Sequence, residues 1–351
     1  MARADKDEDP EFDRIPGLAH PRETFELIGQ DDVLRIAATA IRGGRPPQGL
    51  LLCGPPGSGK ATLAYRIARY LLKYDATDAG PADLAVPPSD PVSLKVLSRA
   101  HPGLLVLTRG LNPESGKPMT VLSVNEIRKL ASFFGLTSGA GGWRVAIIDT
   151  ADEMNDQAAN ALLKALEEPP ARSILLLLSH APGRLLPTIR SRCQLLRMQS
   201  LPASLLAQEL AVRQPHLSDA DRDAVVQLSA GALGLALMLT QGDGLVIAKE
   251  AQRLIDSADN PDLLELFALA DRIGRMKGGL AALGEDLVLN LSSRISARAR
   301  AGAGNALNPW VEAWEKLRHA FGRSTALHLE PRQTILSAAT VLSEAARSGN
   351  L

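Results

Sequence analysis

Residues 49–62 read GLLLCGPPGSGKAT, a short apolar run followed by a glycine-rich loop that ends in Lys60. Gly54, Gly57 and Gly59 allow backbone conformations in which successive N–H groups point at one anion, and the N-terminus of a following helix adds partial positive charge. The stretch predicts a phosphate-binding loop between a strand and a helix, with a plain strand-to-helix turn as the alternative. The predicted nucleotide-binding residues of this loop are Gly54, Gly57, Ser58, Gly59, Lys60, Ala61 and Thr62.

The residue after Lys60 departs from the usual pattern of such loops. Loops that cleave nucleotides carry Ser or Thr at this position, because that hydroxyl binds the Mg²⁺ between the β- and γ-phosphates. Here the residue is Ala61. The loop is therefore suited to hold a nucleotide and poorly suited to hydrolyse it. Whether ATP, ADP or no nucleotide binds stays open, and any use of Mg²⁺ is expected to be weak or absent.

The composition excludes several classes of protein. The 351 residues carry 39 basic and 39 acidic side chains, so the net charge gives no sign of a solitary DNA-binding or membrane-surface protein. Cys53 and Cys193 are too few and too far apart for a disulfide framework or a four-cysteine zinc site. The six histidines lack metal-ligand spacing, so no metal site is expected. No signal peptide or membrane span is evident, and we expect a soluble cytoplasmic protein.

Short apolar runs alternate with helical patterns up to about residue 200. Continuous apolar runs are typical of parallel strands that are buried on both faces, so the alternation predicts an α/β domain with a parallel sheet. Ser123 and Glu126 form a capping box, and Asn155 is placed to cap a helix that stops before Pro169. The expected strands are 49–53, 104–107, 145–148 and 174–178, and the segment 73–101 is expected to be a surface excursion without chemistry.

The strand patterns stop beyond residue 200, and amphipathic helical patterns follow. They predict helices over 204–212, 218–228 and 232–239, and longer ones over 286–300, 309–320 and 332–346. The chain therefore divides into four expected parts: a disordered charged tail (1–18), an α/β nucleotide-binding-like domain (19–200), a small helical lid (201–243) and an all-helical domain (244–351).

A second nucleotide element follows the apolar run at 145–148. Asp149 stands where a strand ends, which is the expected place for an aspartate that holds Mg²⁺ through water. Hydrolysing enzymes of this type carry a glutamate next, and here the residue is Thr150. Asp152 and Glu153 lie further along and are interpreted as solvated loop charges.

Two further stretches are the most specific sequence motifs in the chain. They are NALLKALEEPP, residues 160–170, and LLLLSHAPGRLLPTIRSRCQLL, residues 175–196. In spacing and wording they resemble bacterial clamp-loader subunits of the AAA+ class, whose signature is the triplet at residues 191–193. The resemblance implies a P-loop (AAA+) α/β domain, a helical lid, and a C-terminal helical collar through which subunits join in a ring.

The resemblance also assigns roles to two polar residues. Arg192 would project into the nucleotide site of a neighbouring subunit, where its guanidinium neutralises charge on the transferring phosphoryl group. The structural alternative is an arginine that bonds a local carboxylate. Ser179 matches the family's sensor of the γ-phosphate. Its neighbour His180 suggests a hydrolase pair only weakly, since no GxSxG motif is present and adjacent strand residues point to opposite faces.

The clamp-loader family contains two kinds of subunit: ATPase subunits of the gamma or tau type, and a delta-prime type that completes the ring without hydrolysing ATP. Three catalytic positions are changed in this chain: Ala61, Thr150, and Gly234 in place of the lid arginine of the motif GxxRxAL. Arg192 is retained. The chain is therefore similar to the delta-prime type, which has no ATPase activity of its own.

The delta-prime resemblance implies a set of partners within the DNA polymerase III holoenzyme. They are the gamma or tau and delta subunits of a heteropentamer, with the sliding clamp and primed DNA reached through the complex and no membrane involved. An active ATPase of the gamma or tau type, or another AAA+ ATPase, is the alternative. A P-loop kinase fits less well, because it does not account for the expected lid and helical tail. Zinc is not expected, since the segment 73–101 lacks cysteines.

Overall fold

The computed structural model describes residues 14, 17–76, 79–110, 119, 121–135, 142–302, 304–327 and 330–349. Most of the predicted tail, residues 1–18, lies outside these ranges. The chain forms two compact units, one made of Met1–Leu205 with Ala232–Leu235 and the other of Leu206–Gly231 with Ala236–Leu351. The division of the helical part into a lid and a collar stays a prediction.

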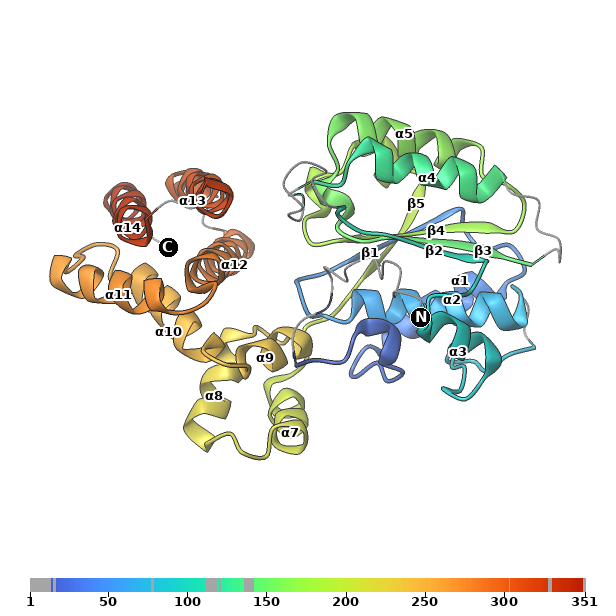
Figure 1. The fold of residues 1–351 in the computed structure, drawn as a ribbon, viewed down its shortest axis with the longest axis horizontal. Helices are drawn as coiled ribbons and strands as arrows, with labels where there is room; N and C mark the ends of the chain where they lie inside the picture. The colour runs from blue at the N-terminus through green and yellow to red at the C-terminus, as the bar shows by residue number, and fades with distance from the viewer. Residues whose placement is uncertain are drawn as a thin grey trace, which may run out of the picture. The chain divides into compact units, whose positions relative to one another are not determined.

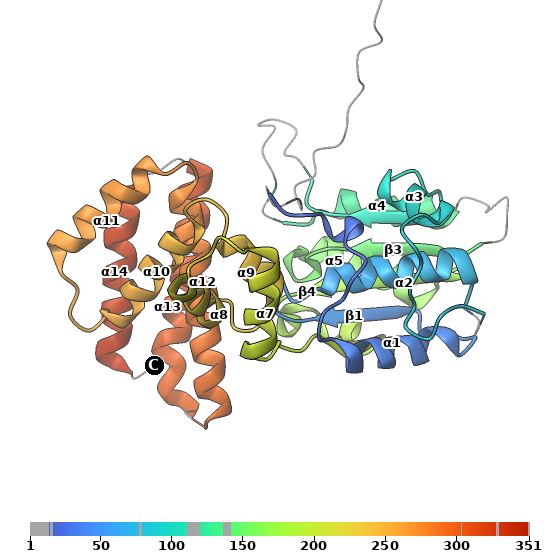
Figure 2. The ribbon, with the colours of Figure 1, turned by 90° about the horizontal axis from the view of Figure 1, so that it is seen from below.

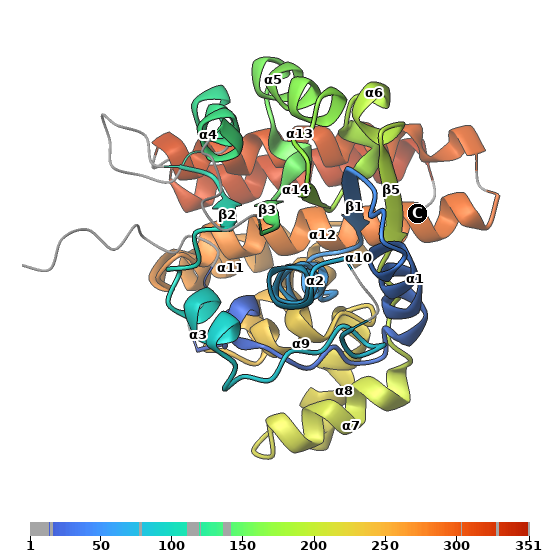
Figure 3. The same cartoon turned by 90° about the vertical axis from the view of Figure 1, so that its right-hand side faces the viewer.

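A parallel five-stranded sheet organises the first unit. The strand order is β2-β3-β4-β1-β5, and each neighbouring pair is parallel. Figure 3 labels β2, β3, β1 and β5, which follow one another in this order across the unit. The predicted α/β class with a parallel sheet, followed by helices, is confirmed. The strands are β1 (Gly49–Cys53), β2 (Leu104–Leu107), β3 (Arg144–Ile148), β4 (Ser173–Ser179) and β5 (Cys193–Arg197).

The sequence does not predict β5, and its position in the sheet explains why. It is an edge strand that pairs only with β1, whereas β1 and β4 are buried along their whole length. Gln194, Leu195 and Arg197 of β5 are exposed. This strand therefore lacks the continuous apolar run that marks β1 and β4.

Helices cover both faces of the sheet (Figure 1). One face carries α1 (Asp31–Arg42), α2 (Lys60–Tyr74) and α3 (Pro91–Leu97), and the other carries α4 (Val124–Gly135), α5 (Asp156–Glu167) and α6 (Pro187–Arg190). Asn155 caps α5 as predicted, because its side chain accepts a hydrogen bond from the Ala158 N–H. Short 3-10 helices lie at η1 (Pro21–Glu23), η2 (Ala151–Glu153), η3 (Pro182–Arg184) and η4 (Gly304–Leu307).

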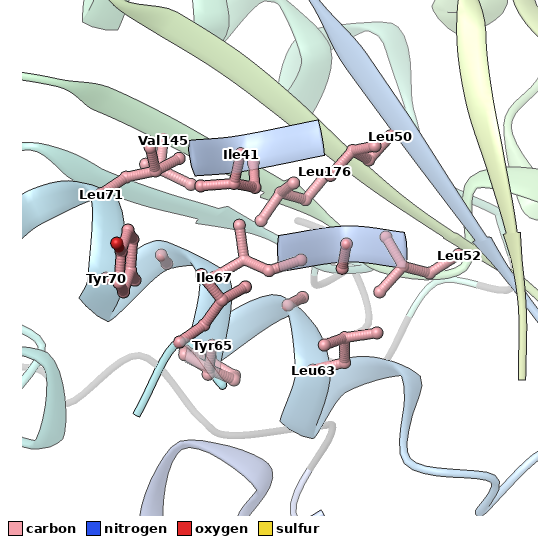
Figure 4. Close-up of a cluster of buried hydrophobic side chains, with 14 of the residues drawn as sticks. Ile41, Leu50, Leu52, Leu63, Tyr65, Ile67, Tyr70, Leu71, Val145 and Leu176 are labelled. Atoms are coloured by element: carbon pink, nitrogen blue, oxygen red, sulfur yellow. The ribbon is translucent and has the colours of Figure 1, made fainter. Parts of the chain in front are cut away.

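The core on the α2 face joins strand and helix residues far apart in sequence. Figure 4 shows Leu50, Leu52 and Leu176 of the sheet beside Leu63 and Ile67 of α2, and all five are fully buried. Burial of each such side chain contributes roughly 1.5–3 kcal/mol.

The expectation that 73–101 is only a surface excursion is wrong. Leu84, Val86 and Val96 belong to the core, and α3 forms within this segment, with Asp90 as its N-cap. Single apolar residues between Pro, Asp and Ser show no helical or strand period, so their burial depends on where the chain folds back and not on a local pattern.

The segment that precedes α1 is tied to the sheet by polar contacts. Gln30 is buried; its Nε2 donates to the carbonyl of Gln199 at 2.7 Å, and the N–H of Gln199 donates to Gln30 Oε1 at 2.9 Å. The fully buried Arg69 of α2 donates from Nη1 to the carbonyl of Arg22 at 2.9 Å. These bonds fix residues 22–30 against the sheet domain.

The second unit is helical, as the ribbon of α10 to α14 shows (Figure 2). These helices share one apolar core that includes Leu283, Leu317 and Leu342. Both α12 and α14 pack against α13. The sequence predicts α12 with a start at residue 286, after its actual start, and does not predict α10 or α11. The helices beyond the sheet are α7 (Ala203–Arg213), α8 (Asp219–Leu228), α9 (Leu233–Leu239), α10 (Gly244–Asp256), α11 (Leu263–Arg275), α12 (Gly279–Arg300), α13 (Asn308–Leu327) and α14 (Pro331–Ser348).

Within the part of the chain that the structure describes, every helix is too short or too polar to cross a membrane.

Candidate functional site

The predicted phosphate loop lies at the carboxyl edge of the sheet, between the end of β1 and the start of α2. Gly57 and Gly59 have φ of 74° and 92°, a region that only glycine enters without strain, and Lys60 opens α2. Ala61 and Thr62 follow in the first turn of that helix. The register pairs Cys53 with Ser179, so the end of β4 lies beside the loop, and the Gly54 N–H donates to the Ser179 carbonyl at 3.2 Å.

The ammonium of Lys60 is engaged by the loop itself. Its Nζ donates to the carbonyls of Gly54 and Pro55, each at 2.8 Å, and the residue is 5% exposed. Burial lowers the pKa of Lys60 to about 8, although the carboxylates of Asp149 and Asp152 oppose the shift. The side chain expected to reach a phosphate therefore bonds the chain's own backbone.

Residues 232–235, which belong to the first unit, touch the loop directly. The N–H of Gly234 donates to the carbonyl of Gly57 at 2.8 Å. A Cβ on Gly234 would lie 2.8 Å from the Gly57 Cα, and a Cβ on Gly57 would lie 2.2 Å from the backbone nitrogen of Leu235. The contact therefore requires glycine on both sides, and the lid motif has glycine where hydrolysing subunits carry arginine.

The cradle keeps polar groups suited to an anion. Ser58 Oγ and Ser179 Oγ are buried and have no hydrogen-bond partner within the described residues. An unpaired buried hydroxyl costs roughly 1–3 kcal/mol, so these two atoms mark a site where polar contacts are incomplete. The donor set suits a phosphate group, but the conformation is closed: a nucleotide could enter only if Lys60 and residues 234–235 moved.

Asp149 and Thr150 follow β3 at the same edge. Asp149 Oδ1 accepts a hydrogen bond from the Thr150 N–H at 2.9 Å, and Thr150 has a left-handed backbone with φ of 49°. A β-branched residue rarely adopts this conformation, so the turn after Asp149 is strained. The glutamate position is therefore filled by a residue that shapes the turn and carries no carboxylate.

Asp152 corrects the interpretation of this turn as a set of solvated charges. It is only 7% exposed, and its Oδ1 accepts a hydrogen bond from the backbone N–H of His180 at 2.9 Å. Glu153 forms an ion pair with Arg109, with 3.4 Å between Oε2 and Nε, and burial raises the pKa of this carboxyl group. Through Asp152, the turn after β3 is therefore bonded to the residue that follows β4.

Arg109 was not among the site residues predicted from the sequence. Its position could have indicated it, because it lies two residues beyond the carboxyl end of β2, at the edge of the sheet that also holds Asp149 and Ser179. Burial and the charge of Lys60 lower the pKa of the nearby His180 to about 4, so its ring is neutral at neutral pH. Because Ser179 Oγ has no partner within the described residues, a Ser–His hydrolase pair has no support.

Arg192 lies on the surface between α6 and β5. Its side chain is 37% exposed; Nη2 lies 2.9 Å from Glu167 Oε1, and Nη1 donates to the Thr188 carbonyl at 3.1 Å. The structural alternative considered for this residue, a bond to a local carboxylate, is thus present, but at an exposed position. The pair leaves the guanidinium accessible from outside the chain.

The sheet register separates Arg192 from the chain's own phosphate loop. Cys193 pairs with Gly49 at the start of β1, and Arg197 pairs with Cys53 at its end. The strand between these levels is about 13 Å long, at roughly 3.3 Å per residue. Lys60, Asp149 and Ser179 therefore share the carboxyl edge, while Arg192 lies at the amino edge and cannot serve the same site.

The described residues contain no group of three His, Cys, Asp or Glu side chains that could hold a metal ion.

Comparison with known proteins finds similarity in the first unit. Residues 29–202 match the family model described as "DNA polymerase III, delta subunit". The "DNA polymerase III subunit delta'" of Pseudomonas aeruginosa is 34% identical over 207 residues, which cover 59% of this chain and 58% of that protein. The protein of the same name from Escherichia coli K12 is 34% identical over 215 residues, 58% of each chain.

A second kind of relative is also similar. The "DNA polymerase III subunit gamma/tau" of Mycobacterium bovis is 29% identical over 266 residues, which cover 68% of this chain and 43% of that protein. The chain thus spans 58% of the length of the two delta' relatives and less than half of the gamma/tau relative.

Proposed function

We propose, from the match of residues 29–202 to the family model described as "DNA polymerase III, delta subunit", that the chain is the delta-prime subunit of a bacterial DNA polymerase III clamp loader. In this role it occupies one position of a heteropentamer with ATPase subunits of the gamma or tau type and a delta subunit. The complex loads a sliding clamp onto primed DNA. The similarity to two proteins named delta' supports the choice of subunit.

The observation that carries the proposal is the exposed guanidinium of Arg192 at the edge of the sheet away from its own phosphate loop. A finger that acts on an adjoining subunit must be accessible and must not be held by its own nucleotide site. Arg192 meets both conditions. In the complex its permanent charge would neutralise the charge that develops on the phosphoryl group during hydrolysis in the neighbouring site.

The chain's own site is proposed to work without nucleotide turnover. Ala61 offers no hydroxyl for Mg²⁺, Thr150 offers no carboxylate to polarise water, and Gly234 brings the lid backbone onto Gly57. ATP or ADP is therefore not required for the role in the ring. Clamp and DNA are reached through the assembled complex, and the helical residues 244–351 are proposed to join the ring.

The experiment is reconstitution with the gamma or tau and delta subunits of the same organism. A tagged chain should co-elute with them as one complex of fixed stoichiometry, measured by size-exclusion chromatography with light scattering. Clamp loading on primed DNA should depend on the addition of this chain. Failure to co-elute, or loading that proceeds equally well without the chain, would overturn the proposal.

An ATPase subunit of the gamma or tau type is the second candidate. Two observations favour it: the similarity to a gamma/tau protein covers 68% of this chain, and the phosphate loop keeps Lys60. The two candidates differ in a single assay. The purified chain with Mg-ATP should show no turnover above background if it is delta-prime, and clear turnover if it is a motor.

A further inference from the structure

The charge next to Arg192 is placed against the usual preference of a helix. Glu167 is the last residue of α5, and Glu168 is its C-cap, because two prolines follow. The C-terminus of a helix carries partial negative charge, so a carboxylate there is unfavourable, while a cation is favourable. Helix stability alone does not explain a glutamate at this position.

The local structure fixes the backbone on both sides of the pair. α5 contacts α6, and Leu162 and Leu166 of α5 share a core cluster with Ile189 of α6. The Arg192 N–H donates to the Ile189 carbonyl at 3.1 Å, which closes the turn that leads into β5. The approach of Glu167 to Arg192 is therefore set by buried packing and not by two loose surface side chains.

The two contacts to the guanidinium orient it and still leave hydrogen-bond donors for another acceptor. Glu167 Oε1 lies 2.9 Å from Nη2 as an ion pair, and the Thr188 carbonyl accepts a hydrogen bond from Nη1. Arginine has five N–H donors in a rigid plane, and the bond to Thr188 uses one of them, so donors remain for another acceptor. A free arginine side chain loses about 2 kcal/mol of rotamer entropy when it is ordered, and a side chain that is already oriented loses less.

We propose that Glu167 is a positioning residue for Arg192: it holds the guanidinium in the exposed orientation from which it reaches the phosphoryl group of an adjoining subunit. This inference rests on the trans role proposed above. Glu167 touches no nucleotide in this scheme and acts only through Arg192. An exposed ion pair of this kind is weak, so it contributes little to the stability of the fold.

The test uses the reconstituted clamp loader with variants of this chain. Glu167→Ala should lower the kcat of DNA-stimulated ATP hydrolysis about fivefold, a factor that an exposed pair can supply, and leave the KM for ATP unchanged. Glu167→Gln should lower the rate to a similar extent, because its amide keeps the size of the side chain but has no charge to pair with the guanidinium. Glu168→Ala is the matched control; Glu168 is the neighbouring exposed glutamate, and its substitution should leave the rate unchanged.

A double variant separates positioning from a structural role. If Glu167 acts only through Arg192, Glu167→Ala should cause no further loss in a chain that already carries Arg192→Ala. A further loss, a Glu167→Ala rate equal to or above that of the unchanged chain, or a full rate with Glu167→Gln would overturn the inference. Failure of the trans role itself shows separately, as unchanged hydrolysis with Arg192→Ala alone.

Discussion

Lys60 and Arg192 are two cations at opposite edges of one sheet, and the chain treats them in opposite ways. Lys60 is 5% exposed and bonded to its own loop, and the backbone of residues 234 and 235 lies against Gly57 of that loop. Arg192 is 37% exposed and held by a weak surface pair. The ammonium of Lys60 is therefore buried, whereas the guanidinium of Arg192 is accessible from outside the chain. A protein can thus keep the sequence of a phosphate loop while its exposed positive charge, here that of Arg192, lies at another edge of the sheet.

The largest effect should follow from removal of the exposed cation. Arg192→Ala should lower hydrolysis at the neighbouring site by roughly 10³-fold, the lower end of what an arginine finger contributes. The free energy of unfolding of the isolated chain should change by less than about 0.5 kcal/mol, because only a surface pair is lost. Steady-state ATPase assays of the complex and urea unfolding of the chain measure the two quantities.

The control for this prediction is Arg190→Ala, which removes a second exposed arginine two residues away. It should leave the rate of the complex unchanged. Equal losses with both substitutions would mean that general positive charge on this surface, and not the single guanidinium of Arg192, supports hydrolysis.

The lid contact should show a smaller effect, on stability. Gly234→Ala places a Cβ 2.8 Å from the Gly57 Cα, so the backbone must move, at a cost of about 1–3 kcal/mol in the free energy of unfolding. Alanine is otherwise the better helix former, so a loss can only come from the contact. Gly183→Ala is the control, since nothing lies within 4 Å of the added Cβ. Equal stability of the two variants in urea would show that the lid is not held on the loop.

The buried lysine should give a pH dependence of similar or slightly smaller size. Its pKa is about 8 in the folded chain and 10.5 ordinarily, so between these values the unfolded chain binds more protons and stability rises with pH. Relative to Lys60→Met, the unchanged chain should gain about 2 kcal/mol in the free energy of unfolding between about pH 7.5 and 9.5. Parallel stability curves for the two proteins would contradict the burial of the ammonium.

The smallest effect should come from repair of the phosphate loop. Ala61→Thr supplies the hydroxyl that binds Mg²⁺, but the cradle stays covered by the lid and Thr150 still lacks a carboxylate. The isolated variant should therefore show no ATP turnover above background in a coupled assay. An active gamma or tau subunit serves as the positive control, and clear turnover by the variant would mean that the lid opens readily.

The fold could be predicted wherever burial leaves a mark on a local stretch of sequence. The runs at 49–53, 145–148 and 174–178 are apolar throughout because their strands are covered on both faces. The edge strand β5 could not be predicted, because it contains the exposed polar residues Gln194 and Arg197. The buried Leu84 could not be predicted either, because it is a single apolar residue in an irregular segment. Such features depend on partners far away in the chain.

The same limit applies to the site. The spacing of the glycines and Lys60 predicted the loop, and the end of β3 predicted the place of Asp149. Neither pattern contains the contact between Gly57 and Gly234, which joins segments more than a hundred residues apart, nor the bond from His180 to Asp152. A sequence motif specifies which groups are available, while tertiary packing decides whether they are free to bind.

The reciprocal bonds between Gln30 and Gln199 link positions 169 residues apart, and these positions nearly coincide with the borders of the family match at 29 and 202. A stretch whose beginning and end meet can be transplanted into another polypeptide without stretching its host. Residues 29–202 are therefore portable in a structural sense, provided that residues 22–28 move with them, because the carbonyl of Arg22 accepts a hydrogen bond from the buried Arg69. A transplant of this stretch alone would leave residues 232–235 behind and expose the phosphate loop, so the graft would regain the open cradle that the whole chain keeps shut.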